Sequence, residues 1–169
     1  MTTYYTHLTS PVGPLQLVGD GEVLQQLRFV TSAQVKQTPN HWIANTEPFI
    51  NCQVQLTAYF KGDLQRFDIP LLPKGTAFQL QVLHQLQQIP YGTTWSYINV
   101  ARAMGSPKAV RAVGAAIAVN PIAIIVPCHR VVGSNGSLTG FAGGLKTKAH
   151  LLQLEGSLSQ YKYHANTTN

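Results

Sequence analysis

The sequence is poor in cysteine and in acidic residues and has no long apolar run, and each shortage excludes a class of protein. Only Cys52 and Cys128 occur in 169 residues, too few for a secreted scaffold held by disulfides. No apolar stretch approaches the roughly 20 residues of a membrane-spanning helix. The N-terminus lacks the charged and then apolar regions of a signal peptide. We therefore expect a cytoplasmic protein with two free thiols, built as one domain or two small ones.

Acidic residues are scarce in only one half of the chain. Residues 1–84 hold five lysines and arginines and five acids, whereas residues 85–169 hold seven lysines and arginines against Glu155 alone. The whole net charge of +6 therefore lies in the second half. Clustered positive charge favours binding to a polyanion through the release of counterions. A basic surface that is merely solvated explains the charge equally well.

The first half of the chain has the pattern of a small α+β unit. Turn signals separate short apolar segments, and a helix follows in which Phe49, Cys52, Leu56 and Tyr59 recur at helical spacing. Cys52 lies on that apolar stripe, so we interpret it as a buried structural residue. We expect strands over 4–8 and 15–18 that pair across Pro11–Gly13, and further strands over 23–30 and 67–69. The other expected elements are a loop or weak helix over 31–46, a helix over 49–60 and a linker over 70–75.

The second half contains helices with clear boundary signals. Thr76 is expected to cap a helix that ends before Pro90, and Ser96 to cap a helix over 97–104. The final helix, over 145–155, stops before a glycine.

A pair of helices around Gly105 is typical of a helix-turn-helix. Gly105 closes the first helix, Pro107 opens the second, and the second runs to about Ala118. Few polar side chains on the second helix reach out to read base edges. We infer close approach to DNA without sequence reading, from the minor-groove side, although core packing explains the small residues equally well. These small residues are Ala109, Ala112, Gly114, Ala115 and Ala116.

The stretch Pro127-Cys128-His129-Arg130-Val131 places a thiol beside two potential cations. The apolar run over 122–126 predicts a buried strand that ends at Pro127. A thiol reacts as its thiolate, which nearby cationic donors such as His129 and Arg130 favour. Adjacent side chains of a strand point to opposite faces, so a water between Cys128 and His129 fits better than direct contact. The alternative interpretation is a small buried core cysteine.

This stretch, extended upstream to Asn120-Pro121 and downstream to Val132-Gly133, strongly resembles the active-site signature of the O6-alkylguanine-DNA alkyltransferase family. The resemblance extends from Phe78 to about Gly156, roughly half the chain. It implies direct-reversal repair of double-stranded DNA. In that reaction the alkyl group of O6-alkylguanine moves irreversibly to a cysteine, once per molecule, after the base has flipped into a pocket.

The resemblance also implies an α+β fold with two parts. Residues 1–75 correspond to a small ribonuclease-H-like scaffold domain. Residues 76–159 correspond to a mostly helical domain that binds DNA and accepts the alkyl group. A polar tail over 160–169 follows.

Five residues align with positions that take part in the family's reaction. Cys128 aligns with the alkyl acceptor, and His129 with the base that takes the thiol proton through a bound water. Glu155 aligns with the acid that orients this histidine. Tyr97 aligns with the tyrosine that pushes the flipping phosphate and hydrogen-bonds the guanine ring. Asn120 aligns with the asparagine that ties the turn before the active site.

Other residues align with the family's DNA interface and alkylguanine pocket. Arg111 matches the arginine that fills the space left by the flipped base and pairs with the orphaned cytosine. Phe141 and Ala142 stand where the family has an aromatic residue followed by Ser or Ala. The further interface residues are Ser96, Lys108, Ala109, Ala112, Gly114 and Ala115, and the further pocket residues are Met104, Val131, Gly143 and Lys148.

The resemblance implies no cofactor, and the small number of potential metal ligands in the N-terminal half predicts no metal. Some relatives hold zinc in the N-terminal half with Cys and His ligands, but only Cys52 and His7 or His41 are available here. The expected partner is double-stranded DNA, bound by a monomer. Cooperative binding, O4-alkylthymine as a substrate and the preferred alkyl size stay open.

Three other functions fit parts of the pattern. A thiol hydrolase would pair Cys128 with a distant histidine such as His84 or His150. A non-catalytic lesion-binding protein would share the frame, although relatives of that kind replace the cysteine, typically with tryptophan. A plain helix-turn-helix regulator would need more polar side chains on its second helix than this chain supplies.

Overall fold

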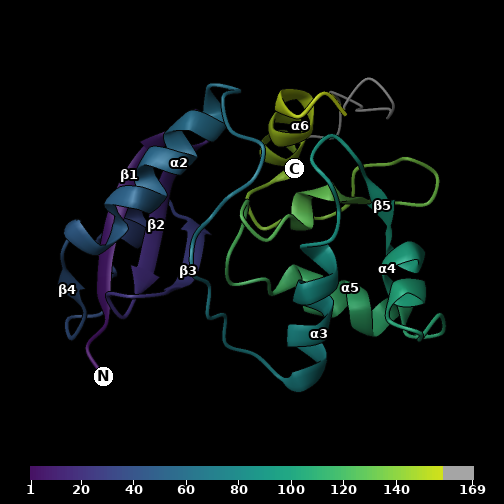
Figure 1. The fold of residues 1–169 in the computed structure, drawn as a ribbon, viewed down its shortest axis with the longest axis horizontal. Helices are drawn as coiled ribbons and strands as arrows, with labels where there is room; N and C mark the ends of the chain where they lie inside the picture. Colours follow the sequence, from purple (N-terminus) through teal and green to yellow (C-terminus); the bar gives the residue numbers. More distant parts are fainter. Residues whose placement is uncertain (158–169) are drawn as a thin grey trace. The chain divides into compact units, whose positions relative to one another are not determined.

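The computed structural model describes residues 1–157, and the chain divides into two compact units (Figure 1). Unit 1 comprises Met1–Lys74 and the short segment Pro121–Ala123, and unit 2 comprises Gly75–Asn120 and the chain from Ile124 on. The predicted α+β class is confirmed, with a small sheet in unit 1 and mostly helices in unit 2. That 1–75 and 76–159 are separate domains stays a prediction, and the expected tail over 160–169 lies outside the described residues.

Unit 1 is built on a four-stranded sheet with the order β3-β2-β1-β4. The first two strands form an antiparallel hairpin across Pro11–Gly13, as predicted, and the third pairs antiparallel with the second. The short β4 pairs in parallel with β1 and was not predicted, because two exposed residues carry no alternating pattern. The strands are β1 Tyr4–Ser10, β2 Gly13–Gly19, β3 Leu24–Phe29 and β4 Ile43–Ala44, and the short helix α1 spans Ser32–Val35.

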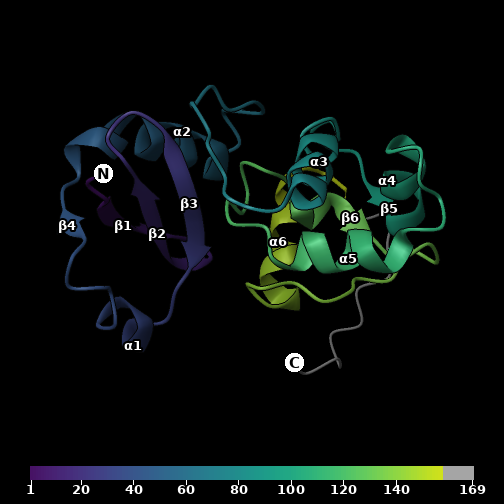
Figure 2. The same ribbon diagram turned by 90° about the horizontal axis from the view of Figure 1, so that it is seen from below.

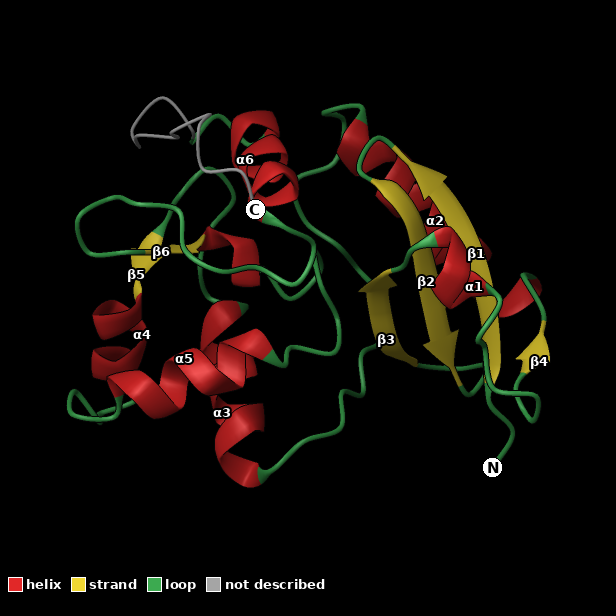
Figure 3. Ribbon diagram, turned by 180° about the vertical axis from the view of Figure 1, so that it is seen from behind, coloured by secondary structure: helices red, strands yellow, loops and turns green. Residues whose placement is uncertain are grey.

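Helix α2, Ile50–Phe60, covers one face of this sheet (Figures 1 and 3). A single 3-10 turn, η1 Glu47–Phe49, leads into it. Its buried stripe consists of Cys52, Leu56 and Tyr59, which is the spacing that the sequence predicted.

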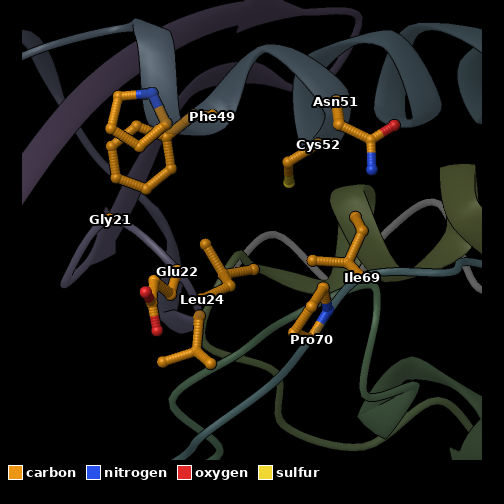
Figure 4. Close-up of a pocket in the computed structure, with 10 residues that line it drawn as sticks. Gly21, Glu22, Leu24, Phe49, Asn51, Cys52, Ile69 and Pro70 are labelled. Carbon is orange, nitrogen blue, oxygen red and sulfur yellow. The ribbon is translucent and has the colours of Figure 1, made fainter.

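Cys52 has a structural environment. Figure 4 shows its side chain extending from α2 toward Leu24 and Ile69, where it lines a cavity of about 220 Å³. Burial raises the pKa of the Cys52 thiol to about 12, so at neutral pH it is a protonated, unreactive group.

The strand predicted over 67–69 is wrong. Asp68 does not pair with the sheet, because its backbone N–H donates to the side chain of Gln55 on α2 and its carbonyl accepts from the same amide. The chain meets the sheet only afterwards. Leu24 donates its N–H to the carbonyl of Pro70, and Leu72 donates to the carbonyl of Leu24.

A second segment pairs with the same edge strand further along. Leu27 donates to the carbonyl of Pro121, and Ala123 donates to the carbonyl of Leu27. These contacts occupy backbone groups that an edge strand would otherwise leave open to other chains.

The strand predicted over 122–126 is also wrong. Only Ile122 makes a bridge to the sheet, and the chain turns at once through Ile124, whose φ is +70°. Ile124 is a buried, β-branched residue, for which this left-handed conformation costs roughly 1–2 kcal/mol. The run was apolar because it is buried, and burial alone does not distinguish a strand from a turn.

Unit 2 contains the predicted helix-turn-helix, whose second helix is α5, Val110–Ala118 (Figure 2). Helix α5 contacts both α3 and α4. A two-stranded parallel ladder joins β5, which directly precedes α4, to β6. The elements are α3 Ala77–Leu86, β5 Trp95–Ser96, α4 Tyr97–Ala103, α5 Val110–Ala118, the 3-10 helix η2 Cys128–Arg130, β6 Val131–Val132 and α6 Leu145–Leu154.

Three helix boundaries agree with the sequence and one does not. Thr76 and Ser96 each form a capping box, and α6 ends beside Gly156 with φ +79°. Helix α5, however, starts at Val110 and not at Pro107. Residues 106–109 form a separate turn, closed by the N–H of Ala109 on the carbonyl of Ser106. Among residues 1–157, no helix has the length and apolar character to cross a membrane.

The cap at Thr76 gives a test of the fold. Its hydroxyl accepts from the N–H of Gln79 at 3.1 Å, and the Gln79 side chain accepts from the N–H of Thr76 at 2.9 Å. Thr76→Ala removes the hydroxyl that accepts from the N–H of Gln79, so we expect the free energy of unfolding to fall by about 1 kcal/mol. Urea denaturation measures this, and Thr76→Ser should keep the wild-type midpoint. An equal loss in both variants would refute the capping role.

Candidate active site

Cys128 lies at the start of a tight turn. Its N–H donates to the carbonyl of Val126, and the N–H of Arg130 donates to the carbonyl of Pro127. Immediately afterwards Val131 and Val132 pair with Trp95 and Ser96. The cysteine is therefore fixed between a turn and a ladder, and its neighbours do not alternate as they would in the predicted strand.

The thiol is buried and protonated. Only 7% of Cys128 is exposed, and burial raises its pKa against the opposing effects of a hydrogen bond with Asn120 and the charge of Lys148. Asn120 also donates from its side chain to the carbonyl of Val126 at 2.9 Å. It therefore ties the turn, as expected, and in addition touches the sulfur. A protonated thiol needs a base before it can attack.

His129 is fully buried and bonded to Glu155. Its Nε2 lies 2.8 Å from Oε2 of Glu155. Burial lowers the pKa of His129, while the charge of Glu155 opposes this effect. Burial by itself would raise the pKa of Glu155, but the electrostatic interactions and hydrogen bonds with His129 and Arg130 outweigh it and lower that pKa to about 2.

These protonation states assign the histidine tautomer. Glu155 is a carboxylate, which only accepts hydrogen bonds, so Nε2 of His129 carries the proton. The other nitrogen, Nδ1, is then a bare acceptor, and it is buried without a hydrogen-bond partner in residues 1–157. A neutral imidazole with a free acceptor nitrogen is suited to act as a general base.

Arg130 does not serve the thiol, contrary to the cationic role considered for it. Its Nε donates to Oε1 of Glu155 at 2.7 Å, and a terminal nitrogen donates to Oε2 at 3.1 Å. The remaining terminal nitrogen donates to the carbonyl of Ile89 at 2.7 Å. The guanidinium also lies 5.7 Å from the ring centre of Tyr91. Arg130 thus fixes the carboxylate that orients His129.

Lys148 is buried, so it is not a solvated lysine on the surface of α6. It is 1% exposed, and its Nζ donates to the carbonyls of Val131 at 2.6 Å and Thr139 at 3.1 Å. Burial lowers its pKa to about 8, with the cysteine opposing this effect. The amine therefore links β6 to the loop that precedes α6.

Tyr97, the first residue of α4, is half-buried and points its hydroxyl at that loop. Its oxygen lies 2.7 Å from Oγ1 of Thr139. Beside the ring lies Gly114 of α5, where an added Cβ would stand 3.8 Å from a ring carbon. Sequence reasoning missed Thr139, because a threonine among glycines carries no chemical signature.

Helix α5 presents a small, basic outer face. Arg111, Ala112 and Ala115 are exposed, and so is Lys108 in the preceding turn, whereas Val113, Ala116 and Ile117 are buried. Core packing therefore does not explain the small side chains at 112 and 115. Ala109 and Gly114 are half-buried. The Ser96 hydroxyl is engaged in its helix cap with Asn99.

The other predicted pocket residues lie at the end of α4, in β6 and in the loop before α6. Met104 is the C-cap of α4, and Val131 is fully buried in β6. Phe141 and Gly143 are half-buried and Ala142 is exposed, in a turn closed by the N–H of Gly144 on the carbonyl of Phe141. That they enclose the substrate stays a proposal.

The alternative bases for a thiol hydrolase lie at the surface. His84 on α3 and His150 on α6 are both exposed, whereas Cys128 is buried. In the part of the chain that the structure describes, no three His, Cys, Asp or Glu side chains gather to hold a metal ion.

A buried cysteine beside a histidine held by a carboxylate, next to a helix pair with a basic face, defines a nucleophile-bearing α+β protein. Residues 3–73 match the family model for the ribonuclease-like domain of 6-O-methylguanine DNA methyltransferase, and residues 77–157 match the model for its DNA-binding domain. The chain therefore belongs to the family of methylated-DNA–protein-cysteine methyltransferases.

Individual relatives cover nearly the whole chain. A methylated-DNA–protein-cysteine methyltransferase of Methanosarcina acetivorans is 51% identical over 154 residues, which is 91% of this chain and 99% of that protein. One of Mycobacterium bovis is 47% identical over 91% of this chain and 93% of its own. Among solved structures, Mycobacterium tuberculosis OGT in complex with DNA has a TM-score of 0.84 at 46% identity and covers 94% of both chains.

Replacing Glu155 with glutamine tests the buried charge. The pKa is about 2 in the folded protein against an ordinary value of 4.5. The carboxylate thus stabilises the fold fully above about pH 4.5, and this stabilisation is lost as the pH falls towards 2. We expect Glu155→Gln to lower the free energy of unfolding by about 3 kcal/mol at neutral pH.

Urea denaturation as a function of pH measures both effects. The difference between Glu155→Gln and wild type should shrink as the solution is acidified below about pH 4.5. Glu22→Gln is the matched control, because Glu22 is exposed and should change little. A constant difference across this range would contradict the assigned charge of Glu155.

Proposed function

We propose that this chain repairs O6-alkylguanine in double-stranded DNA by transferring the alkyl group to Cys128. The observation that carries the proposal is the buried Nδ1 of His129, which has no hydrogen-bond partner in residues 1–157. This histidine directly follows Cys128 in the sequence and is oriented by Glu155, which Arg130 also binds. Membership of the methyltransferase family supports the reaction. The residue assignments below are inferred from the geometry and the family resemblance.

The first step is removal of the thiol proton. Nδ1 of His129 accepts it through a water molecule, and the carboxylate of Glu155 stabilises the imidazolium that forms. Arg130 and Glu155 touch neither sulfur nor substrate in this scheme, so they are positioning residues. The charge of Lys148 and the hydrogen bond with Asn120 favour the thiolate while it exists.

The second step is displacement at the alkyl carbon. The thiolate attacks, a carbon–sulfur bond forms, and the bond between carbon and O6 breaks with its electron pair left on guanine. Tyr97 donates a proton to a ring nitrogen, so guanine leaves as a neutral base. Phe141 supplies an aromatic wall, and the backbone N–H of Ala142 is a donor for O6.

The reaction requires that the protein first gains access to the base. Chemistry on a base inside a duplex requires that it flip out, at a cost of a few kcal/mol. The exposed Ala112 and Ala115 let α5 approach the minor groove closely. Arg111 enters the stack and pairs with the orphaned cytosine, and Lys108 neutralises phosphate.

The product is a thioether on Cys128, and no described side chain is arranged to hydrolyse it. The protein is then a stoichiometric reagent with one turnover per molecule, acting as a monomer. We place it in the cytoplasm, where the reducing environment suits its two free cysteines. The presence of Cys128 favours transfer over the non-catalytic lesion binder, and the exposed positions of His84 and His150 disfavour the thiol hydrolase.

Mass spectrometry tests whether Cys128 is the alkyl acceptor. We would mix the protein with a duplex that carries one O6-methylguanine, measure the intact mass and map the modified peptide. We expect one added methyl group per molecule, on the Cys128 peptide. Cys128→Ala should bind the lesion without gaining mass. Cys52→Ala is the matched control and should react fully, because Cys52 is buried in unit 1 with a protonated thiol.

Two results would contradict the proposal. Methylation of Cys128→Ala would remove Cys128 as acceptor. Tight binding by an unmodified wild-type protein would favour the lesion binder.

The flipping role of Arg111 is tested by comparing two substrates. Repair of duplex DNA needs the flipped base, whereas free O6-benzylguanine does not. We expect Arg111→Ala to slow repair of the duplex at least about tenfold, a barrier change of about 1.4 kcal/mol, with little effect on the free base. Arg102→Ala removes an exposed arginine from α4 and is the matched control. Equal losses on both substrates would exclude the flipping role.

A further inference from the structure

The hydroxyl of Thr139 lies 2.7 Å from the hydroxyl of Tyr97. Thr139 lies in the loop between β6 and α6, and both residues are half-buried. The oxygen–oxygen distance is that of a good hydrogen bond. The proposed function gives Tyr97 a proton to donate but leaves Thr139 without a role.

The loop that carries Thr139 is itself fixed to the active site. The carbonyl of Thr139 accepts from Nζ of Lys148 at 3.1 Å, and the same Nζ donates to the carbonyl of Val131 at 2.6 Å. Val131 directly follows the turn of Cys128–Arg130. Because Lys148 is buried, water does not compete for these bonds. The position of the Thr139 hydroxyl is therefore tied to that of the cysteine.

The direction of the bond between the two hydroxyls decides what Tyr97 can do. A phenol has one proton. If Tyr97 donates to Thr139, that proton is not available to a base. If Thr139 donates to Tyr97, the phenol proton points elsewhere, and the phenol oxygen gains a donor that stabilises the negative charge left when its proton moves.

We propose that Thr139 is a positioning residue that donates its hydroxyl proton to Tyr97 and so aims the phenol proton at the flipped guanine. This inference rests on the proposed function, in which guanine leaves with a proton from Tyr97. The step balances: the thiol proton resides on His129, and the phenol proton resides on guanine. Tyr97 is left as a phenolate that Thr139 stabilises. Exchange of one proton with solvent then returns both side chains to their starting forms.

The test separates this role from a purely structural one. Thr139→Val keeps the shape of the side chain and removes the donor, whereas Thr139→Ser keeps the donor. We would measure the single-turnover rate at saturating protein, together with the dissociation constant, for duplex O6-methylguanine and for free O6-benzylguanine. We expect Thr139→Val to slow transfer about tenfold on both substrates with an unchanged dissociation constant. Thr139→Ser should restore the rate.

A double-mutant cycle with Tyr97→Phe gives the sharper readout. If Thr139 acts only through the phenol hydroxyl, Thr139→Val has no further effect once that hydroxyl is absent. A multiplicative loss in the double variant, or a wild-type rate in Thr139→Val, would overturn the inference. A loss on duplex DNA alone would do the same, because it would place the effect at the phosphate.

The same data distinguish failure of the inference from failure of the proposed function. If Tyr97→Phe reacts at the wild-type rate, Tyr97 is no proton donor and Thr139 has nothing to aim, although methyl transfer stands. If wild type itself gains no methyl group, the proposed function fails. Slow transfer by Tyr97→Phe with normal transfer by Thr139→Val overturns the Thr139 role alone.

Discussion

The interaction on which the active site depends is the sharing of one carboxylate between two neighbours in sequence. Glu155 is the one buried carboxylate in residues 1–157, and it accepts from both His129 and Arg130. A buried guanidinium without this partner would be an uncompensated charge, and a buried imidazole without it would lose both its tautomer and its orientation. Since Glu155 is the C-cap of α6, the last described helix completes a site whose other members lie on the 3-10 helix η2. The packing of α6 and the chemistry of the cysteine are therefore not separable.

The same arrangement suits a reagent that works once. A thiolate that is always present would react with oxidants and other electrophiles before it met a lesion. Here burial keeps Cys128 protonated, and burial also lowers the pKa of His129, the base in the proposed reaction. Reactivity then depends on a correctly seated substrate rather than on a standing charge. The amine of Lys148 and the amide of Asn120 both favour the thiolate form of Cys128.

Sequence reasoning anticipated those features that depend on local rules. Capping residues such as Thr76 and Ser96, the hairpin before Gly13, the stripe around Cys52 and the stop at Gly156 each rest on a few adjacent side chains. It failed where the outcome depends on distant partners. The apolar run before Cys128 became a turn because its backbone pairs with β3 only at one point. Residues 67–69 do not form the predicted strand, because the side chain of Gln55 on α2 binds the backbone N–H and carbonyl of Asp68. At the site, motif residues were found, whereas the linking roles of Arg130, Lys148 and Thr139 appear only when the chain is folded.

Unit 1 is discontinuous in sequence, since its sheet includes Pro121–Ala123 from the middle of the second half. The chain must therefore pass between the units three times, and the third passage is made at Ile124 in a strained conformation, four residues before the cysteine. A single cut after Lys74 releases neither unit intact. Exchange of the second half for another chain would remove the two backbone partners of Leu27 in β3, Pro121 and Ala123. The segment matched by the DNA-binding model thus contains residues, Pro121–Ala123, that complete the sheet of the ribonuclease-like segment.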